Sequence, residues 1–331
     1  MTASHMPDLS RLAGVATAAE LAAAGMSRAQ LRGLIRRGAW IRLAHGVFAP
    51  AGLVAAEATS PVGEHAVHAA AALAVNPGAV ASHRSAALIH GLDMLGRRAE
   101  RAETVTLTRP PGSTSRRVGR AGIRLHIAAL PDGHVVDHRG MPVTSVARTV
   151  ADLARAAPFP AGVVVADAAL RTRQMSKADL DLCITDCARW PGIQAARRAA
   201  GFADARSESA LESISRVAFH EHGLPPPDLQ AWVGNEDEVI GRADFLWRAY
   251  RTVGEADGAI KYADPARAMA QLERDARLRA AGFEVVHFTW RDVTRSPGEV
   301  VAAVKAAFRR GLAQNRRPAP GGIRSGACPR T

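Results

Sequence analysis

Three carboxylates and one amine stand close together between residues 242 and 261, in the sequence RADFLWRAYRTVGEADGAIK. Asp244 ends one apolar run. Glu255 and Asp257 end the next run, and Lys261 follows. If the two runs are adjacent antiparallel strands, these side chains converge at one edge of a sheet. Mg²⁺ prefers oxygen ligands, and a bound metal ion polarises a phosphodiester and activates water for attack. The segment therefore predicts a Mg²⁺-dependent nuclease site.

These carboxylates also have structural alternatives. Asp244 closely follows Arg242, and an ion pair between them at the end of a strand would contribute about 0–1 kcal/mol. Asp257 precedes Gly258, which is typical of a turn. Glu255 and Asp257 lie two residues apart, however, so on one strand they point to the same face. Neighbouring acids repel each other unless a cation or a proton lies between them, which favours the metal-binding interpretation.

The elements that must position these residues follow the order α-β-β-β-α-β-α. Apolar periodicity and turn residues predict helices at 209–222, 265–281 and 296–310, and strands at 229–233, 239–246, 250–255 and 283–290. Glu212 projects from the first of these helices. Glu208, Glu212 and Arg216 have i, i+4, i+8 spacing, which by itself indicates an ion-pair ladder on a helix surface.

Residues 8–55 have the pattern of a winged helix-turn-helix. Thr17 and Glu20 form a capping box that opens a first helix, and Ser27 caps a second helix. A small hairpin follows at 40–48. Two helices joined by a short turn and followed by a hairpin are the elements of this motif.

Arginines are frequent on the second helix and the hairpin of this motif. Arg and Gln side chains read base edges in the major groove, and arginines also bind phosphates. The alternatives are a solvated helix face in an arginine-rich protein and a docking surface for another protein. The candidate DNA-binding residues are Arg28, Arg32, Arg36, Arg37 and Arg42.

The middle of the chain, residues 61–200, predicts a mixed α/β linker domain. We expect helices at 62–75, 82–89, 145–157, 161–171, 177–188 and 192–200, and strands at 105–108 and 123–127. The helix at 145–157 carries Val146, Val150 and Leu153 on its inner face. At the other end, residues 312–331 are rich in Pro, Gly and Arg, which predicts a basic disordered tail.

The composition favours a polyanionic partner. The 331 residues carry a formal net charge of +12, which attracts nucleic acid. No run approaches the roughly 20 apolar residues of a membrane helix, and no signal peptide is recognisable, so we expect a cytoplasmic protein without a membrane partner. Cys183 and Cys187 lie one helical turn apart with no nearby His or Cys to complete a zinc site, which indicates ordinary buried residues.

The first part of the chain resembles a known family. The segments 15–25, 36–38 and 42–48 are similar to the N-terminal domain of AbiEi-type antitoxins, which belong to type IV toxin–antitoxin systems. Members of that family are winged-helix proteins that bind DNA and repress their own operons. The resemblance implies double-stranded DNA, such as an operator, as a partner, and a cognate toxin gene product as another.

The last part, residues 204–311, resembles the PD-(D/E)XK nucleases, and especially the very-short-patch-repair-like (Vsr-like) endonucleases. The similar segments, in chain order, are ESALES at 208–213, Arg242-Ala-Asp244-Phe245, Glu255-Ala-Asp257-Gly258, Arg274-Asp275 and Phe288-Thr-Trp290. In such proteins the helix that carries Arg274 faces the site. Both a DNA-phosphate contact and a salt bridge on the helix face remain open for Arg274.

The resemblance implies a role for each acidic residue. Asp244 and Glu255 would bind the Mg²⁺ ion, and Glu212 would complete the acidic catalytic cluster. The family pattern has a lysine where this sequence has Asp257, so the sequence departs from it there. Lys261 lies just beyond and would supply the missing positive charge.

The sequence thus predicts an α+β multidomain protein with an N-terminal winged helix-turn-helix, a mixed α/β middle region and a C-terminal restriction-endonuclease-like αβββαβ core. Two functions remain open. One is a Mg²⁺-dependent endonuclease that hydrolyses DNA, and the other is a non-enzymatic antitoxin-type transcriptional regulator with a vestigial nuclease fold. The retained carboxylates favour the enzyme.

Overall fold

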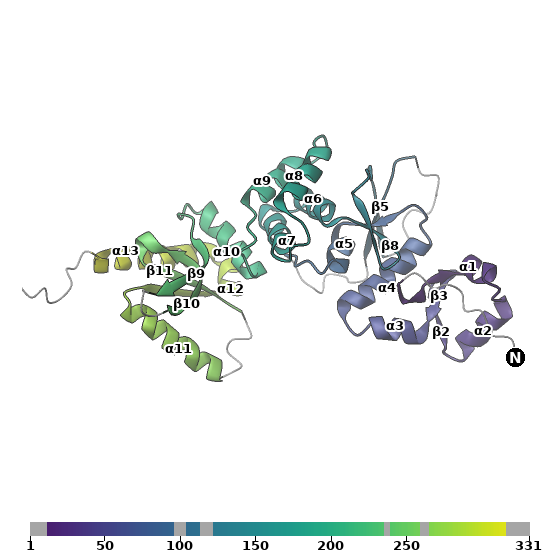
Figure 1. Cartoon of the computed structure of the whole chain (residues 1–331), viewed down its shortest axis with the longest axis horizontal. Coiled ribbons are helices and arrows are strands. Elements are labelled where there is room, and N and C mark those ends of the chain that lie inside the picture. The colour runs from purple at the N-terminus through teal and green to yellow at the C-terminus, as the bar shows by residue number, and fades with distance from the viewer. Residues whose placement is uncertain (1–11, 96–103, 113–121, 235–238, 259–264, 316–331) are drawn as a thin grey trace, which may run out of the picture. The chain divides into compact units, whose positions relative to one another are not determined.

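A computed structural model describes residues 12–95, 104–112, 122–234, 239–258 and 265–315 of the chain (Figure 1). The chain divides into two compact units, Met1–Ala205 and Arg206–Thr331, here called unit 1 and unit 2. Among the helices of the described residues, none combines the length and the apolar character needed to cross a membrane.

Unit 1 begins with a winged helix-turn-helix. Its elements are the 3₁₀ turn η1 (Leu12–Gly14), β1 (Ala16–Thr17), α1 (Ala18–Ala23), α2 (Arg28–Arg36), β2 (Trp40–Ala44) and β3 (Val47–Pro50). The three strands pair in the order β1-β3-β2. The two helices and the hairpin confirm the expected motif, and β1 adds a third strand that the sequence did not indicate.

Side-chain caps determine where both helices of the motif begin. The Thr17 hydroxyl accepts the Glu20 N–H, and the Glu20 carboxylate accepts the Thr17 N–H at 2.7 Å. Ser27 and Gln30 form the same capping box at α2. Between the helices Gly25 adopts φ +85°, a left-handed conformation that residues with a side chain rarely adopt. Local sequence signals therefore specify this turn.

The middle region forms a mixed five-stranded sheet of order β6-β5-β4-β8-β7. Its elements are α3 (Ala51–Glu57), α4 (Pro61–Ala74), β4 (Val80–Ala81), α5 (His83–Ile89), β5 (Val105–Arg109), β6 (Ile123–Ile127), β7 (Val135–His138) and β8 (Met141–Thr144). Strands β5 and β6 and helices α4 and α5 confirm the sequence prediction. The short strands β4, β7 and β8 were not predicted, because two to four residues are too few to show a period.

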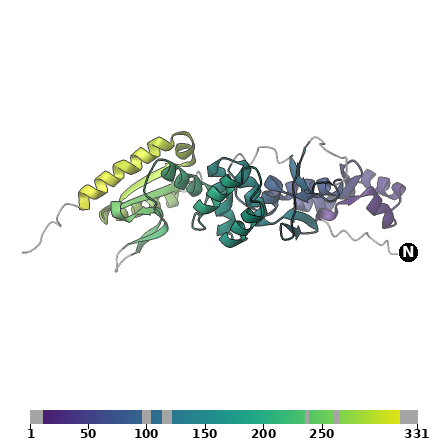
Figure 2. The same ribbon diagram turned by 90° about the horizontal axis from the view of Figure 1, so that it is seen from above.

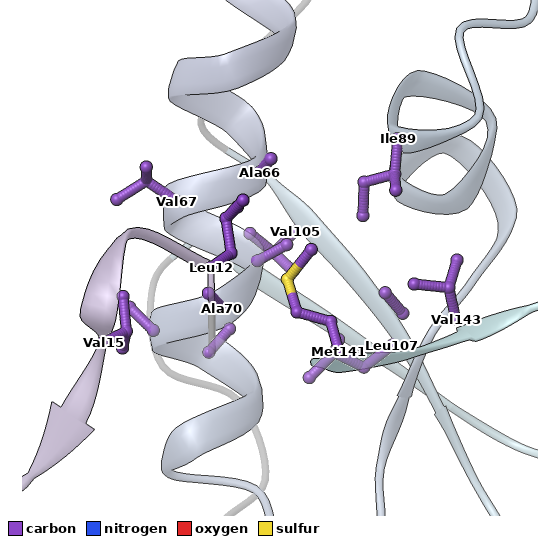
Figure 3. Packing of buried hydrophobic residues seen from close by; sticks show 14 of the residues in the cluster. Leu12, Val15, Ala66, Val67, Ala70, Ile89, Val105, Leu107, Met141 and Val143 are labelled. Atoms are coloured by element: carbon purple, nitrogen blue, oxygen red, sulfur yellow. The ribbon is translucent and has the colours of Figure 1, made fainter. Parts of the chain in front are cut away.

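Part of the winged helix packs into a buried cluster of this middle region. Val15 and Val47 belong to one buried cluster with Ala66 and Ala70 of α4 and Leu107 of β5 (Figure 3). The alanines of α4 lack bulky side chains, so the helix packs closely against its neighbours. Strands of the winged helix thus contribute to the core of the middle region, beside a separate buried cluster within the motif that includes Leu21, Leu31 and Trp40.

Four further helices complete unit 1, namely α6 (Val146–Ala156), α7 (Phe159–Arg171), α8 (Lys177–Asp186) and α9 (Ile193–Phe202). The expected inner face of α6 is only partly right. Val150 is fully buried, but Val146 and Leu153 are half-buried. Arg148 and Asp152 take the innermost positions instead and form a salt bridge of 2.8 Å. Apolar periodicity did not reveal this face because its most buried large residue is charged.

Unit 2 contains a four-stranded sheet of order β12-β11-β10-β9. Its elements are α10 (Ala210–Glu221), β9 (Asp228–Gly234), β10 (Val239–Trp247), the 3₁₀ turn η2 (Arg248–Tyr250), β11 (Thr252–Asp257), α11 (Pro265–Ala280), β12 (Glu284–Thr289), α12 (Trp290–Arg295) and α13 (Pro297–Asn315). The expected order α-β-β-β-α-β-α is present, with η2 and α12 in addition. Helix α13 continues into the start of the segment predicted to be a tail, and residues 316–331 lie outside the described residues.

Helices cover both faces of this sheet (Figures 1 and 2). On one face Leu278 of α11 packs with Leu246 and Val253. On the other face Phe308 of α13 contacts Trp247, with ring centroids 5.3 Å apart. Leu246 and Trp247 are consecutive residues of β10, so their side chains point to opposite faces. The acidic residues of the sequence analysis lie within this framework.

Candidate functional site

The arginines predicted to contact DNA lie on α2 and the β2–β3 hairpin. All of them are exposed: Arg28, Arg32, Arg36, Arg37 and Arg42. The only acidic residue in the sequence between positions 12 and 50 is Glu20. Its carboxylate is bound to Thr17 at the start of α1. The surface of this motif is therefore strongly positive, as a phosphate-binding surface must be.

Two polar groups of this surface have defined positions. The Gln30 side-chain oxygen accepts the Ser27 N–H at 2.8 Å, so Gln30 caps α2. In the hairpin, the Arg42 Nε donates to the Ala44 carbonyl at 3.2 Å, and its Nη2 lies 2.8 Å from Nδ1 of His45. The hairpin thus presents Arg42 in a fixed orientation.

A second candidate surface lies in unit 2, where Asp244 and Glu255 are neighbours. Phe245 of β10 pairs with Gly254 of β11, so Asp244 and Glu255 are the next residues outward on the two antiparallel strands. An Asp244 oxygen accepts the Ala256 N–H at 2.8 Å. The strand pairing assumed in the sequence analysis therefore exists, and it brings these two carboxylates together.

Gln230 joins Asp244 to Glu212. Its amide nitrogen lies 2.8 Å from a Glu212 oxygen and 3.2 Å from an Asp244 oxygen. Gln230 has φ +51°, a left-handed conformation that costs a residue with a side chain about 1–3 kcal/mol. The sequence analysis assigned no role to Gln230, although a strained backbone at this position fits a residue whose side chain must reach two carboxylates.

Glu212 is a buried residue with only 6% of its surface exposed. Its oxygens accept the Glu208 N–H and the Ser209 hydroxyl, each at 2.8 Å. The surface ladder considered for Glu208, Glu212 and Arg216 is wrong for Glu212, because this side chain points into the protein. Burial raises the pKa of Glu212 above its usual value; the hydrogen bond from the Glu208 N–H opposes the rise, and the charge of Asp244 adds to it.

Arg274 of α11 reaches across to the sheet. Its Nη2 forms a salt bridge of 2.9 Å with Glu255, whose surface is 2% exposed, and donates to the Arg242 carbonyl at 2.6 Å. Arg242 in turn forms a salt bridge of 2.7 Å with Glu208, and not the ion pair considered with Asp244. The Arg274 side chain therefore reaches from α11 to Glu255, which is one of the acidic residues of the candidate site.

His287 was not predicted as a site residue, yet it lies between two acids. Its Nδ1 lies 3.0 Å from Asp257 and its Nε2 lies 2.8 Å from Asp275. These contacts raise the pKa of His287, with the Asp257 hydrogen bond as the main cause. The parallel pairing of β11 with β12 places His287 beside Glu255. A lone histidine in a strand carries no sequence signal of such a pairing.

The carboxylates are thus close together but engaged by protein groups. Within the part of the chain that the structure describes, no three of them bring oxygens within 4.8 Å of one another. Lys261 lies outside the described residues. Among the described residues, Arg274 forms a salt bridge with Glu255, and His287 forms one with Asp257.

The winged helix and its arginine surface agree with the family that the front of the chain matches. Residues 6–51 match the family described as "Transcriptional regulator, AbiEi antitoxin". The N-terminal resemblance is therefore confirmed, and it defines the class of the first domain.

A longer similarity connects the chain to two proteins of Mycobacterium tuberculosis. These are the uncharacterized protein MT2308 of strain CDC 1551 / Oshkosh and the uncharacterized protein Rv2248 of strain ATCC 25618 / H37Rv. Each is 30% identical over 286 residues, which is 84% of this chain and 96% of the relative. The chain belongs to the same family as these proteins. The alignment is longer than unit 1, so the similarity extends into unit 2.

Proposed function

We propose that this protein is a DNA-binding transcriptional regulator of the AbiEi antitoxin kind. The observation that carries the proposal is the surface of α2, where exposed arginines occur without a free acidic neighbour and the fold is that of a winged helix. The match of residues 6–51 to an antitoxin regulator family supports it.

The proposed interface divides into two parts. In helix-turn-helix proteins the second helix enters the major groove, and its first residues contact base edges. Arg28 and Arg32 lie in the first half of α2 and are our candidates for base contacts. Arg36 and Arg37 at its end, together with Arg42 in the hairpin, are candidates for phosphate contacts, which position a protein on the duplex. The partner is double-stranded DNA, with an operator near its own gene as the proposed target.

The experiment is a salt titration of DNA binding by the full chain, measured by fluorescence anisotropy. The probe is duplex DNA from upstream of the coding sequence, with a scrambled duplex for comparison. Losing one phosphate contact in Arg36→Ala should weaken binding to both duplexes and reduce the salt slope by about 1. Losing a base contact in Arg28→Ala should reduce the preference for the upstream duplex. Arg197→Ala, an exposed arginine of α9, is the matched control. If all three variants bind like the wild type, the proposed interface is wrong.

A second candidate function concerns unit 2. We propose that it is a PD-(D/E)XK-type, Vsr-like nuclease domain with Asp244 and Glu255 as metal ligands. Three observations support this. The α-β-β-β-α-β-α order is present, Asp244 and Glu255 are neighbours on paired strands, and Gln230 connects Asp244 to the buried Glu212.

The donor chemistry of this cluster fits Mg²⁺, because that ion binds through one or two carboxylates and retains several waters. When bound, Mg²⁺ would polarise a phosphodiester and activate a water molecule. The chain's own residues have three further roles in this proposal. Gln230 orients Asp244, Arg274 forms a salt bridge that positions Glu255, and His287 pairs with Asp257.

This second function is tested with supercoiled plasmid and Mg²⁺ at matched protein concentrations. Wild-type protein should nick the plasmid, and Asp244→Asn and Glu255→Gln should not. Asp228→Asn is the control, because Asp228 lies in the same unit and only pairs with Arg248 on the surface. Equal nicking by all four proteins would indicate a contaminating nuclease. Absence of nicking by the wild type would leave DNA binding as the function of the chain.

A further inference from the structure

Three side chains of the kinds that bind soft metal ions meet inside unit 1. One ligand atom each of His134, Cys183 and Cys187 lies within 4.8 Å of the other two. All three residues are buried, with 4%, 5% and 1% of their surfaces exposed. The sequence indicated two ordinary buried cysteines without a histidine. That interpretation is incomplete, because the fold brings His134 to them from about 50 residues away in the chain.

The backbone holds each of these residues in place. Cys183 lies on the buried face of α8, and the Cys187 N–H donates to the Cys183 carbonyl at 3.1 Å at the end of that helix. His134 precedes β7, and its own N–H donates to the Pro131 carbonyl at 3.0 Å. Its carbonyl accepts the Ser145 N–H at 2.9 Å. A metal ion needs ligands positioned in advance in this way.

A buried arginine borders the cluster. Arg148 is fully buried, and its Nη1 lies 3.2 Å from Nδ1 of His134. Its Nη2 has no hydrogen-bond partner among the described residues. The thiolate is the form of cysteine that binds metals.

A carboxylate completes the surroundings of the histidine. An Asp186 oxygen lies 3.1 Å from Nε2 of His134. Metal-binding histidines usually make such a contact with a carboxylate, which fixes the orientation of the ring. A cavity of about 440 Å³ is lined by His134, Cys183 and Asp186 among other residues, so an ion has a path to the cluster.

We propose that His134, Cys183 and Cys187 bind a divalent cation of the zinc class. Two sulfurs and one imidazole nitrogen are typical zinc ligands, whereas Mg²⁺ and Ca²⁺ require oxygen. Metal–sulfur bonds of about 2.3 Å and metal–nitrogen bonds of about 2.0 Å place tetrahedral ligand atoms about 3.5 Å apart, so a small contraction of the cluster suffices. Because Asp186 holds Nε2, the imidazole binds the ion through Nδ1, which gives up its contact with Arg148, and water takes the fourth position.

Binding exchanges the two thiol protons for the metal ion, and the protons go to the solvent. Two thiolates, a neutral imidazole and a divalent cation sum to zero charge, which makes burial of the cluster acceptable. The ion would tie the end of α8 to the start of β7. This role does not depend on either function proposed above, because none of the residues involved belongs to the arginine surface or to the acidic cluster.

The test is a cobalt titration of the chelator-treated full chain, followed by absorption. Co²⁺ in a tetrahedral site with thiolates gives sulfur-to-cobalt charge-transfer bands and intense d–d bands, and zinc should displace it. We expect saturation at one ion per chain. His134→Asn, Cys183→Ser and Cys187→Ser should each abolish or strongly reduce the charge-transfer bands. Cys328→Ser, which removes the remaining cysteine of the sequence, is the matched control and should leave them unchanged.

A second measurement covers variants that fail to fold. Zinc should protect Cys183 and Cys187 of the wild-type protein from alkylation, as read from their peptides by mass spectrometry, and should raise the melting temperature. Absence of charge-transfer bands and of protection in the wild type would overturn the proposal. So would bands that persist in a folded Cys183→Ser/Cys187→Ser double variant.

Discussion

The imidazole Nδ1 of His287 lies 3.0 Å from an oxygen of Asp257. The other ring nitrogen lies 2.8 Å from Asp275. Because each nitrogen faces a carboxylate, the ring is most stable with both nitrogens protonated. His287 thus supplies a positive charge beside the Asp257 carboxylate.

We expect the pKa of His287, measured by NMR titration of the imidazole, to lie above its usual value of 6.5. Asp257→Asn should lower this pKa more than Asp275→Asn does, because the Asp257 hydrogen bond is the larger cause of the shift. The exposed His220 on the nearby helix α10 is an internal reference. A His287 pKa that does not respond to either substitution would contradict the pairing.

The same contact makes the stability of unit 2 depend on pH. The folded-state pKa of His287 is raised, so its contribution is fully present below the unfolded-state pKa and is lost as pH rises through the folded-state pKa. Relative to His287→Gln, the wild type should gain on the order of 1 kcal/mol at about pH 6 and less at about pH 9. Hydrogen exchange of β11 and β12, corrected for intrinsic rates, measures this. A difference that does not change with pH would argue against it.

Loss of the Gln230 side chain should destabilise unit 2 more than loss of an ordinary surface amide does. Gln230→Ala removes the donor shared by Glu212 and Asp244, and the loss of one hydrogen bond from each carboxylate should cost about 1–3 kcal/mol. We expect faster hydrogen exchange in α10 and β10. Gln314→Ala is the control, because Gln314 donates to Glu284 at the exposed end of α13. Equal exchange in the two variants would show that Gln230 is dispensable.

The sequence predicted those parts of the fold that depend on neighbours in the chain. The caps of α1 and α2 are predicted by Thr17, Glu20 and Ser27, and the structure contains both caps. The element order of unit 2 was likewise predictable, because its helices and central strands are long enough to show a period. Each of these signals depends on residues that lie only a few positions apart in the chain.

Contacts between distant residues were not predictable. His287 meets Asp257 only because β12 pairs in parallel with β11 after the crossover through α11. His134 meets Cys183 only because the fold brings the residue before β7 to α8. Neither pairing changes the local pattern of apolar and polar residues. The positions of Asp244 and Glu255 were accessible from the sequence because antiparallel strands that follow each other in the chain usually pair.

Loss of the buried salt bridge of α6 should strongly lower the stability of unit 1. Arg148 and Asp152 are both fully buried, and Arg155 also donates to Asp152 at 3.0 Å. Asp152→Asn leaves a buried arginine charge uncompensated, which costs about 3–5 kcal/mol. The exposed pair of Arg171 and Asp93 provides the control, and Asp93→Asn should cost about 0–1 kcal/mol. Hydrogen exchange of α6 and α7 compares the stability of the Asp152→Asn and Asp93→Asn variants. Similar losses of stability would mean that α6 tolerates the uncompensated charge of Arg148.

Two glycines of α13 should respond to alanine in opposite ways. A Cβ at Gly311 would lie 2.1 Å from the Tyr250 carbonyl oxygen, far inside van der Waals contact, whereas a Cβ at Gly298 would meet no atom within 4 Å. Gly311→Ala should therefore destabilise unit 2 by about 1–3 kcal/mol through overpacking, although alanine favours helices. Gly298→Ala should be neutral or stabilising by up to about 1 kcal/mol. Urea denaturation of the two variants, with hydrogen exchange of α13 to locate the effect, measures both. If Gly311→Ala were as stable as Gly298→Ala, the close packing of α13 against Tyr250 would be refuted.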